Sequence, residues 1–170
     1  MNILVVMPDE AYQNRLVGSI KEVTAAADKV CYISLNKTYN AVEIMFEEHG
    51  LKMEKFFFID AVSSEFMPVK DTGNCSFSKS VKDLPGLTSD IKSLLKKMEF
   101  DTIIFDSIST LFIYHPEEDI VRFCRDLMGY FSVTTAAAVF TTLQKDMKRE
   151  ALKELRMVVD KVIEIPSYMK

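Results

Sequence analysis

The residues with the clearest chemical potential are a carboxylate and two hydroxyls that follow a mostly apolar run. The run at 102–105 ends at Asp106, and Ser107 and Ser109 come directly afterwards. Such a run predicts a strand buried on both faces, with the Asp106 carboxylate at its end. A carboxylate in this place can hold a magnesium ion beside phosphate groups. A single aspartate at a strand end is, however, more often a turn acceptor, and serines commonly form caps and turns.

Phosphate binding would need a second part, which is a loop of glycines and a lysine after the first strand. In the pattern G-x-x-x-x-G-K-[ST], backbone N–H groups surround the phosphates and the lysine neutralises them. The apolar run at 3–6 predicts that first strand, but Pro8, Asp9 and Glu10 follow it, and the first glycine is Gly18. Pro8 removes one N–H donor, and the two acids place negative charge at the helix end that attracts anions. This turn therefore opposes phosphate binding.

The other reactive side chains form no recognisable catalytic or metal-binding group. His49 and His115 are isolated, and the spacing supports no Ser-His-Asp or Cys-His group. The three cysteines contain no C-x-x-C pair, so neither a zinc site nor a disulfide framework is indicated. Cys31 and Cys124 lie in apolar patterns and are expected to be buried thiols. We predict no metal site, with Asp106 as a ligand only if a nucleotide binds.

Charge and hydropathy exclude further classes of protein. The net charge of −4 argues against a duplex nucleic-acid binder, and the mixed charges at 145–161 indicate a solvated helix face with ion pairs. We therefore expect no nucleic-acid partner. No segment approaches the roughly 20 apolar residues of a membrane span, and no basic segment of a signal peptide precedes the run at 3–6. These observations predict a cytoplasmic protein without a membrane partner.

Strands and helices alternate along the chain and would position the candidate residues. Strands are predicted at 3–6, 29–35, 56–60, 102–106, 133–143 and 161–165. Helices are predicted to begin at Pro8, after a cap at Thr38 or Asn40, and at Pro116. Others are predicted to cover 87–98 and 145–157, and Gly50 is expected to end the second helix. The segment 61–85 interrupts this rhythm as a loop excursion, with a short strand at 66–69. The alternation predicts one α/β domain over residues 1–170, a three-layer sandwich with a mainly parallel sheet.

In such a sheet, a ligand binds at the carboxyl ends of the strands, near a point where the strand order reverses. The segments expected at that edge are 7–10, 35–37, Asp60, 106–109 and 141–145.

In this order, the elements resemble the core of the RecA-type ATPases, and most closely the KaiC-like branch of archaea and bacteria. Residues 30–35 look like the second core strand of that family, and residues 100–111 resemble its Walker B strand. Residues 139–142 correspond to the strand that ends in a polar sensor, and residues 160–165 are similar to the last strand. The resemblance implies a P-loop NTPase fold, with Asp106 and Ser107 at Walker-B-like, nucleotide-binding positions.

Two departures from that family concern its catalytic parts. Pro8, Asp9 and Glu10 stand at the P-loop position. Asn36 and Lys37 stand where the family has paired glutamates, one of which polarises the attacking water. An amide and an ammonium group cannot accept a proton from that water at neutral pH. The family uses ATP and magnesium, but these departures predict no catalytic residue and no cofactor here.

Three hypotheses follow for the function. The first is a pseudo-ATPase domain, a regulatory or protein-interaction module that associates with itself or with an ATPase paralogue, because RecA-type cores commonly pack side by side. In it, Asp106 would be a structural carboxylate that holds the turn into Ser107 and Ser109. The second is a nucleotide-binding ATPase with an unconventional phosphate site. The third is a small-molecule binding domain that uses the crevice at the strand ends.

Overall fold

The computed structural model describes residues 1–167, which build one seven-stranded, fully parallel sheet. Its strand order is β4-β3-β2-β5-β6-β1-β7. The strands are β1 (Asn2–Met7), β2 (Val30–Ser34), β3 (Phe56–Asp60), β4 (Cys75–Phe77), β5 (Thr102–Asp106), β6 (Ala137–Leu143) and β7 (Lys161–Glu164).

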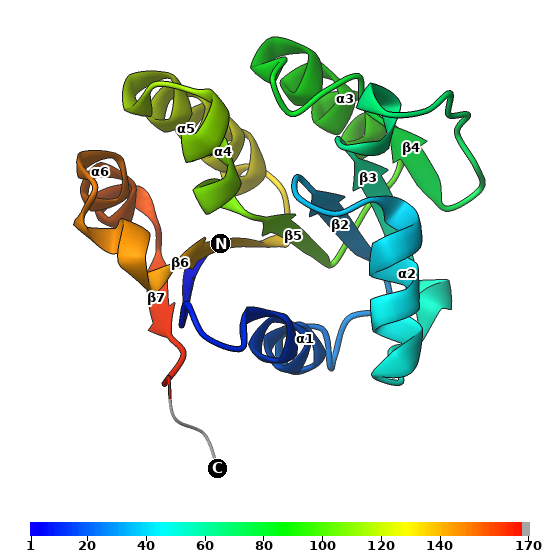
Figure 1. Cartoon of the computed structure of the whole chain (residues 1–170), viewed down its shortest axis with the longest axis horizontal. Helices are drawn as coiled ribbons and strands as arrows, with labels where there is room; N and C mark the ends of the chain where they lie inside the picture. Colours follow the sequence, from blue (N-terminus) through cyan, green and yellow to red (C-terminus); the bar gives the residue numbers. More distant parts are fainter. Residues whose placement is uncertain (168–170) are drawn as a thin grey trace.

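Helices cover both faces of the sheet, which confirms the predicted α/β sandwich of three layers. Figure 1 shows α1 and α2 on one face and α3 to α6 on the other. The helices are α1 (Tyr12–Val23), α2 (Tyr39–Glu48), α3 (Leu84–Lys97), α4 (Ile108–Tyr114), α5 (Glu117–Ser132) and α6 (Glu150–Val158). Three short 3₁₀ helices join them, η1 (Met53–Lys55), η2 (Ser63–Glu65) and η3 (Gln144–Lys148).

The sheet separates two apolar cores. Under α1 and α2, Tyr32 packs edge-on against Phe46 with ring centroids 5.2 Å apart. On the opposite face, Phe105 packs against Phe140 with centroids 5.4 Å apart. All six residues of β1 are buried, as expected for a strand covered on both faces.

Several predicted details are confirmed. Gly50 follows the end of α2 with a φ of +71°, a left-handed conformation that glycine adopts without a steric penalty. Thr38 is the N-cap of α2, since its hydroxyl accepts a hydrogen bond from the Ala41 N–H. Cys31 and Cys124 are buried free thiols, and burial raises the pKa of both.

Other expected boundaries are wrong. The first helix begins at Tyr12 and not at Pro8, because Ala11 adopts a left-handed φ of 53° that breaks the helix before it. The short strand expected at 66–69 lies instead at β4, within the excursion. Helix α4 was not expected, since its seven residues offer too little periodicity. The helix expected at 145–157 is divided into η3 and α6 by the extended residue Arg149.

Candidate functional site

Asp106 lies fully buried at the end of β5, and both of its carboxylate oxygens accept hydrogen bonds from hydroxyl groups. The Tyr32 hydroxyl donates to Oδ2 at 2.6 Å. The Tyr12 hydroxyl donates to Oδ1, and the Thr141 hydroxyl also reaches Oδ1 at 3.2 Å. These donors come from β2, α1 and β6, so one carboxylate joins three elements to β5.

The electrostatics of this cluster keep the tyrosines protonated. Burial raises the pKa of Asp106, and hydrogen bonds from Tyr12, Tyr32 and Thr141 oppose that rise, as does the charge of Lys37. Burial and the negative charge of Asp106 raise the pKa of both tyrosines well above the usual value of a phenol. Tyr12 and Tyr32 therefore remain hydrogen-bond donors to the carboxylate at neutral pH.

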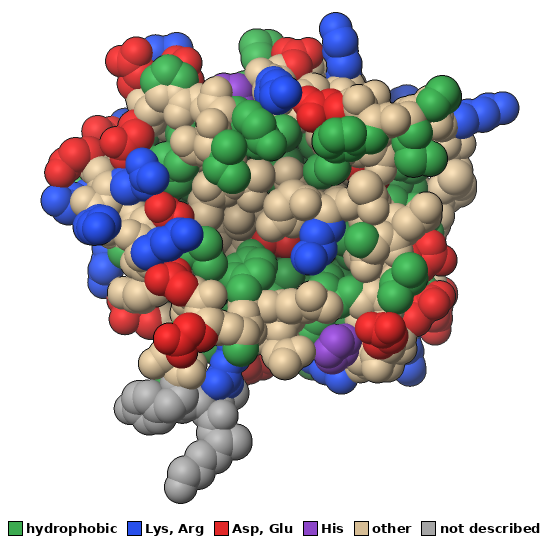
Figure 2. All heavy atoms as spheres, viewed as in Figure 1, with side chains coloured by type: hydrophobic (Ala, Val, Ile, Leu, Met, Phe, Trp, Pro, Cys, Tyr) green, Lys and Arg blue, Asp and Glu red, His purple; other side chains and the backbone are tan. Residues whose placement is uncertain are grey.

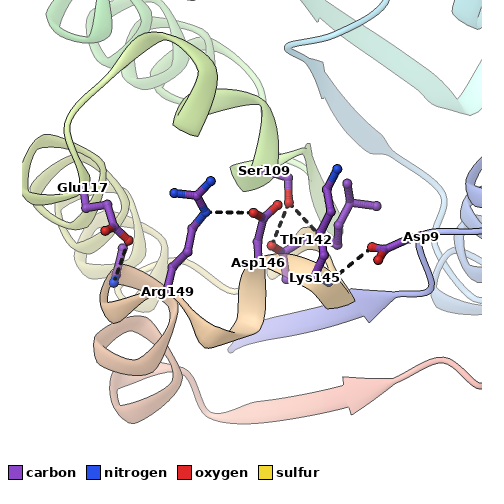
Figure 3. Close-up of polar contacts among 9 residues, drawn as sticks. Asp9, Ser109, Glu117, Thr142, Lys145, Asp146 and Arg149 are labelled. Atoms are coloured by element: carbon purple, nitrogen blue, oxygen red, sulfur yellow. Dashed lines mark hydrogen bonds and ion pairs between the residues drawn. The ribbon is translucent and has the colours of Figure 1, made fainter.

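The turn from β1 to α1 places its charges at the surface. Asp9 and Glu10 are exposed, and Asp9 Oδ1 accepts a hydrogen bond from the Lys145 backbone N–H at 3.2 Å, drawn in Figure 3. The helix then begins at Tyr12, whose side chain reaches Asp106. The segment at the predicted P-loop position thus connects β1 to η3 and to the buried cluster.

The structure brings the other predicted site residues to the same edge of the sheet. Asn36 is exposed after β2, and the Lys37 backbone bonds to the Ser34 hydroxyl, which fixes this turn. Ser107 shares a hydrogen bond of 3.2 Å with Thr110.

Ser109 makes its contacts with β6. Its hydroxyl lies 3.0 Å from the Thr142 hydroxyl and accepts from the Leu143 N–H at 2.8 Å, as Figure 3 shows. Within residues 1–167, the Asp106 carboxylate makes no hydrogen bond to Ser107 or Ser109. The expectation that Asp106 holds the turn into these serines is therefore wrong, because the hydroxyls of neighbouring elements occupy its oxygens.

A cavity of about 400 Å³ opens at this edge, and we call it the strand-end cavity. It lies between the β1–α1 turn, α4 and η3. Its lining residues are Asp9, Tyr12, Asn36, Ser107, Ser109, Thr110, Phe112, Ile113, Leu143, Lys145, Asp146 and Arg149. Asp146 is buried and pairs with Arg149 at 2.8 Å, and the Arg149 guanidinium lies 4.3 Å from the centre of the Phe112 ring.

Asp60, a second predicted strand-end residue, is also fully buried but holds a local turn. Its Oδ1 accepts from the N–H groups of Val62 and Ser63, and its Oδ2 accepts from the Tyr39 N–H and the Ser63 hydroxyl. Four donors satisfy this carboxylate, and no lining residue of the strand-end cavity is among them.

Sequence reasoning missed the partners of Asp106. Thr141 lay within a segment expected at the strand ends and Tyr12 lay just beyond another, but neither had a predicted role. A signal was present at Tyr32, because the hydroxyl of a tyrosine inside a fully buried strand needs a hydrogen-bond partner. Within residues 1–167, no group of three or more His, Cys, Asp or Glu side chains could hold a metal ion. In the same range, no helix is both long and apolar enough to cross a membrane.

The sequence matches the model of a known protein family. The model described as "Family of unknown function (DUF7504)" matches residues 2–165. The chain belongs to this family. No curated protein matches the sequence.

The fold is also found among solved structures. The KaiC-like protein PH0186 from the hyperthermophilic archaeon Pyrococcus horikoshii OT3 matches 96% of this chain and 69% of its own chain, with a TM-score of 0.67. The two sequences are 13% identical, so the match speaks to the fold alone. The KaiC-like, RecA-type fold expected from the sequence is confirmed.

Proposed function

We propose that this chain is a RecA-like domain that does not hydrolyse nucleotide and acts as a regulatory or protein-interaction module. The observation that carries the proposal is the closed carboxylate of Asp106, whose two oxygens accept hydroxyl hydrogen bonds inside the protein. Asp106 is also fully buried, so a magnesium ion could reach its carboxylate only by displacing Tyr12 or Tyr32, whose hydroxyls bond to it. Leaving one such donor buried and unpaired costs about 1–3 kcal/mol.

The surrounding turns support the same proposal. Phosphates bind at a helix start that offers free N–H groups and no competing negative charge. Here the start of α1 follows Pro8, Asp9 and Glu10. Asn36 and Lys37 offer no carboxylate to activate water. The residues present therefore do not fit a magnesium-bound nucleotide.

Exposed apolar side chains support a role in protein contact. Phe66 is 77% and Ile113 is 73% exposed, and Met67 and Tyr114 are exposed beside them in sequence. Contacts of Lys82 join the two segments, because its ammonium group pairs with Glu65 and lies 5.6 Å from the centre of the Tyr114 ring. Figure 2 shows apolar side chains gathered over the α3 and α4 region. Such gatherings commonly mark interaction surfaces. The partner we propose is a second copy or a RecA-like ATPase.

Nucleotide binding gives the first test. Thermal unfolding is measured with ATP, ADP and magnesium, each alone and combined, for the native chain and for Asp106→Asn, and ATP hydrolysis is assayed in parallel. We expect no shift in Tm and no hydrolysis. A shift that depends on magnesium and disappears in Asp106→Asn would support an ATPase with an unconventional phosphate site and overturn the proposal.

Association gives the second test. Sedimentation velocity over a range of concentrations is compared for the native chain, Ile113→Glu and, as a matched control, Val133→Glu. Val133 is 84% exposed at the end of α5, outside the two segments that carry Phe66 and Ile113. We expect Ile113→Glu alone to weaken self-association or binding to a KaiC-like ATPase. A native chain that stays monomeric and binds no such ATPase would contradict the module proposal.

A further inference from the structure

We infer that the strand-end cavity binds a small zwitterion, a molecule that carries one ammonium and one carboxylate group. This inference goes beyond the proposed function and is independent of it, because it concerns a ligand without phosphate or magnesium. The strand-end cavity has a volume of about 400 Å³, within the range of ligand sites, which runs from roughly 300 to 1,000 Å³. Its position at the strand ends is where parallel sheets bind ligands.

A larger cavity, of about 790 Å³, lies between α3 and α5 and is a weaker candidate. The charged side chains that line it are engaged with each other or with their neighbours. Arg122 pairs with Asp119 at 3.4 Å, and Asp126 pairs with Lys92 at 2.8 Å. That cavity offers a ligand little uncompensated charge.

The strand-end cavity combines a buried polar floor with an apolar wall. Ser107, Ser109 and Thr110 line the cavity and are at least nine-tenths buried. Phe112 and Leu143 provide apolar surface beside them. A few polar groups set among apolar walls are typical of sites that orient a small ligand.

Two cationic side chains line the cavity. Arg149 pairs with Asp146 through Nε. Its two terminal nitrogens form no ion pair within residues 1–167 and can serve a second acceptor. Lys145 adds an ammonium group that forms no ion pair within residues 1–167. In Figure 3, Lys145 and Arg149 project on either side of Asp146. A carboxylate can accept from a guanidinium and an ammonium group together.

The cavity lining also includes a carboxylate beside Lys145. The Asp9 carboxylate lines the cavity and, in the same described part of the chain, forms no ion pair. Asp9 accepts only the Lys145 N–H, at 3.2 Å, which leaves capacity for an ammonium donor. A simple anion would be repelled by Asp9, and a simple cation would be repelled by Lys145. A ligand that carries both charges can pair its carboxylate with the cationic side chains and its ammonium group with Asp9.

The test uses ω-amino acids of increasing length, from glycine through γ-aminobutyrate to 6-aminohexanoate, as probes in titration calorimetry and thermal unfolding. Butyrate and butylamine carry only one of the two charges and are the controls. We expect saturable binding for at least one amino acid, with a Tm rise of about 2 °C or more at saturating ligand. Neither single-charge control should match it. Equal binding of butyrate, or no binding of any amino acid, would overturn the inference.

Variants place the ligand in the cavity. Lys145→Met and Asp9→Asn should each weaken binding by about tenfold, which corresponds to roughly 1.4 kcal/mol. Asn at position 9 still accepts the Lys145 N–H, so the turn is retained. Lys148→Met and Glu10→Gln change neighbouring exposed charges that do not line the cavity, and both should bind like the native chain. Undiminished binding in Lys145→Met would refute the inference, whatever the result with nucleotides.

Discussion

Two strands of the sheet end on a fully buried aspartate, Asp60 after β3 and Asp106 after β5, but the two carboxylates have different kinds of partner. Asp60 accepts from the backbone N–H groups of Tyr39, Val62 and Ser63, and from the Ser63 hydroxyl. The direction of a backbone N–H is fixed by the chain. Asp60 therefore fixes the turn after β3 and the start of α2.

Within residues 1–167, the Asp106 carboxylate accepts hydrogen bonds only from hydroxyls. The donors are Tyr12, Tyr32 and Thr141, which lie 94, 74 and 35 residues away in sequence. A hydroxyl hydrogen rotates about its C–O bond, so the same oxygen can also accept. The comparison shows two uses of one residue type. Asp60 holds the turn that follows its own strand. Asp106 joins three distant elements, at the position where an ATPase would need a free carboxylate.

The largest effect is expected for Asp60→Asn. The amide nitrogen would replace one oxygen that now accepts fixed N–H donors, so two donors would face each other in a buried site. We expect a loss of about 3 kcal/mol of unfolding free energy, measured by urea denaturation. A loss below that of Asp106→Asn would show that the fixed donors do not distinguish the two carboxylates.

The next effect concerns pH. Because Tyr12 and Tyr32 have raised pKa values in the folded state, the folded chain keeps these protons above pH 10 while the unfolded chain releases them. Stability should therefore fall as pH rises through that range, by up to about 1.4 kcal/mol per pH unit for each tyrosine. Tyr32→Phe should reduce the slope in urea denaturation, and Tyr12→Phe with Tyr32→Phe should reduce it further. If the unfolding free energy of the double variant falls with pH as steeply as that of the native chain, Tyr12 and Tyr32 are not its cause.

The sequence predicts much of this arrangement, for physical reasons. Apolar runs such as 3–6 and 56–60 identify buried strands, and the alternation with helices identifies the layers. The strand-end position of Asp60 and Asp106 follows from those runs. Their partners do not, because a hydrogen bond between Asp106 and a residue 94 positions away depends on strand order and not on local pattern.

Local irregularities were also beyond prediction. Ala11 adopts a left-handed conformation that glycine usually provides, so the start of α1 has no sequence signal. Helix α4 is too short to show periodicity, and β4 has three residues. The strand-end cavity depends on both the α1 start and α4, which explains why its lining could not be assembled from the sequence.

Asp106→Asn should have a smaller effect than the same change at Asp60, within about 1 kcal/mol at neutral pH. The Tyr32 hydroxyl can turn to accept from the new amide, and the variant buries no charge. Because burial raises the pKa of Asp106, the native chain loses stability as pH rises from the ordinary pKa of an aspartate through the folded value. The variant should lack this dependence in urea denaturation between pH 4 and neutrality. The same pH profile in both proteins would contradict the raised pKa.

The smallest effect is expected for Thr38→Ala, which removes the N-cap hydroxyl of α2. Loss of such a cap costs about 0.5–1 kcal/mol, and here the lower value is expected. The Thr38 hydroxyl accepts from Ala41 at 3.3 Å, whereas Asp60 accepts from the Tyr39 N–H at 2.7 Å and lies near the same helix start. Urea denaturation of Thr38→Ala, Asp60→Asn and the double variant measures how the two acceptors share this role. If Thr38→Ala proves as costly as Asp60→Asn, the start of α2 is fixed by its own cap, and Asp60 loses the organising role that separates it from Asp106.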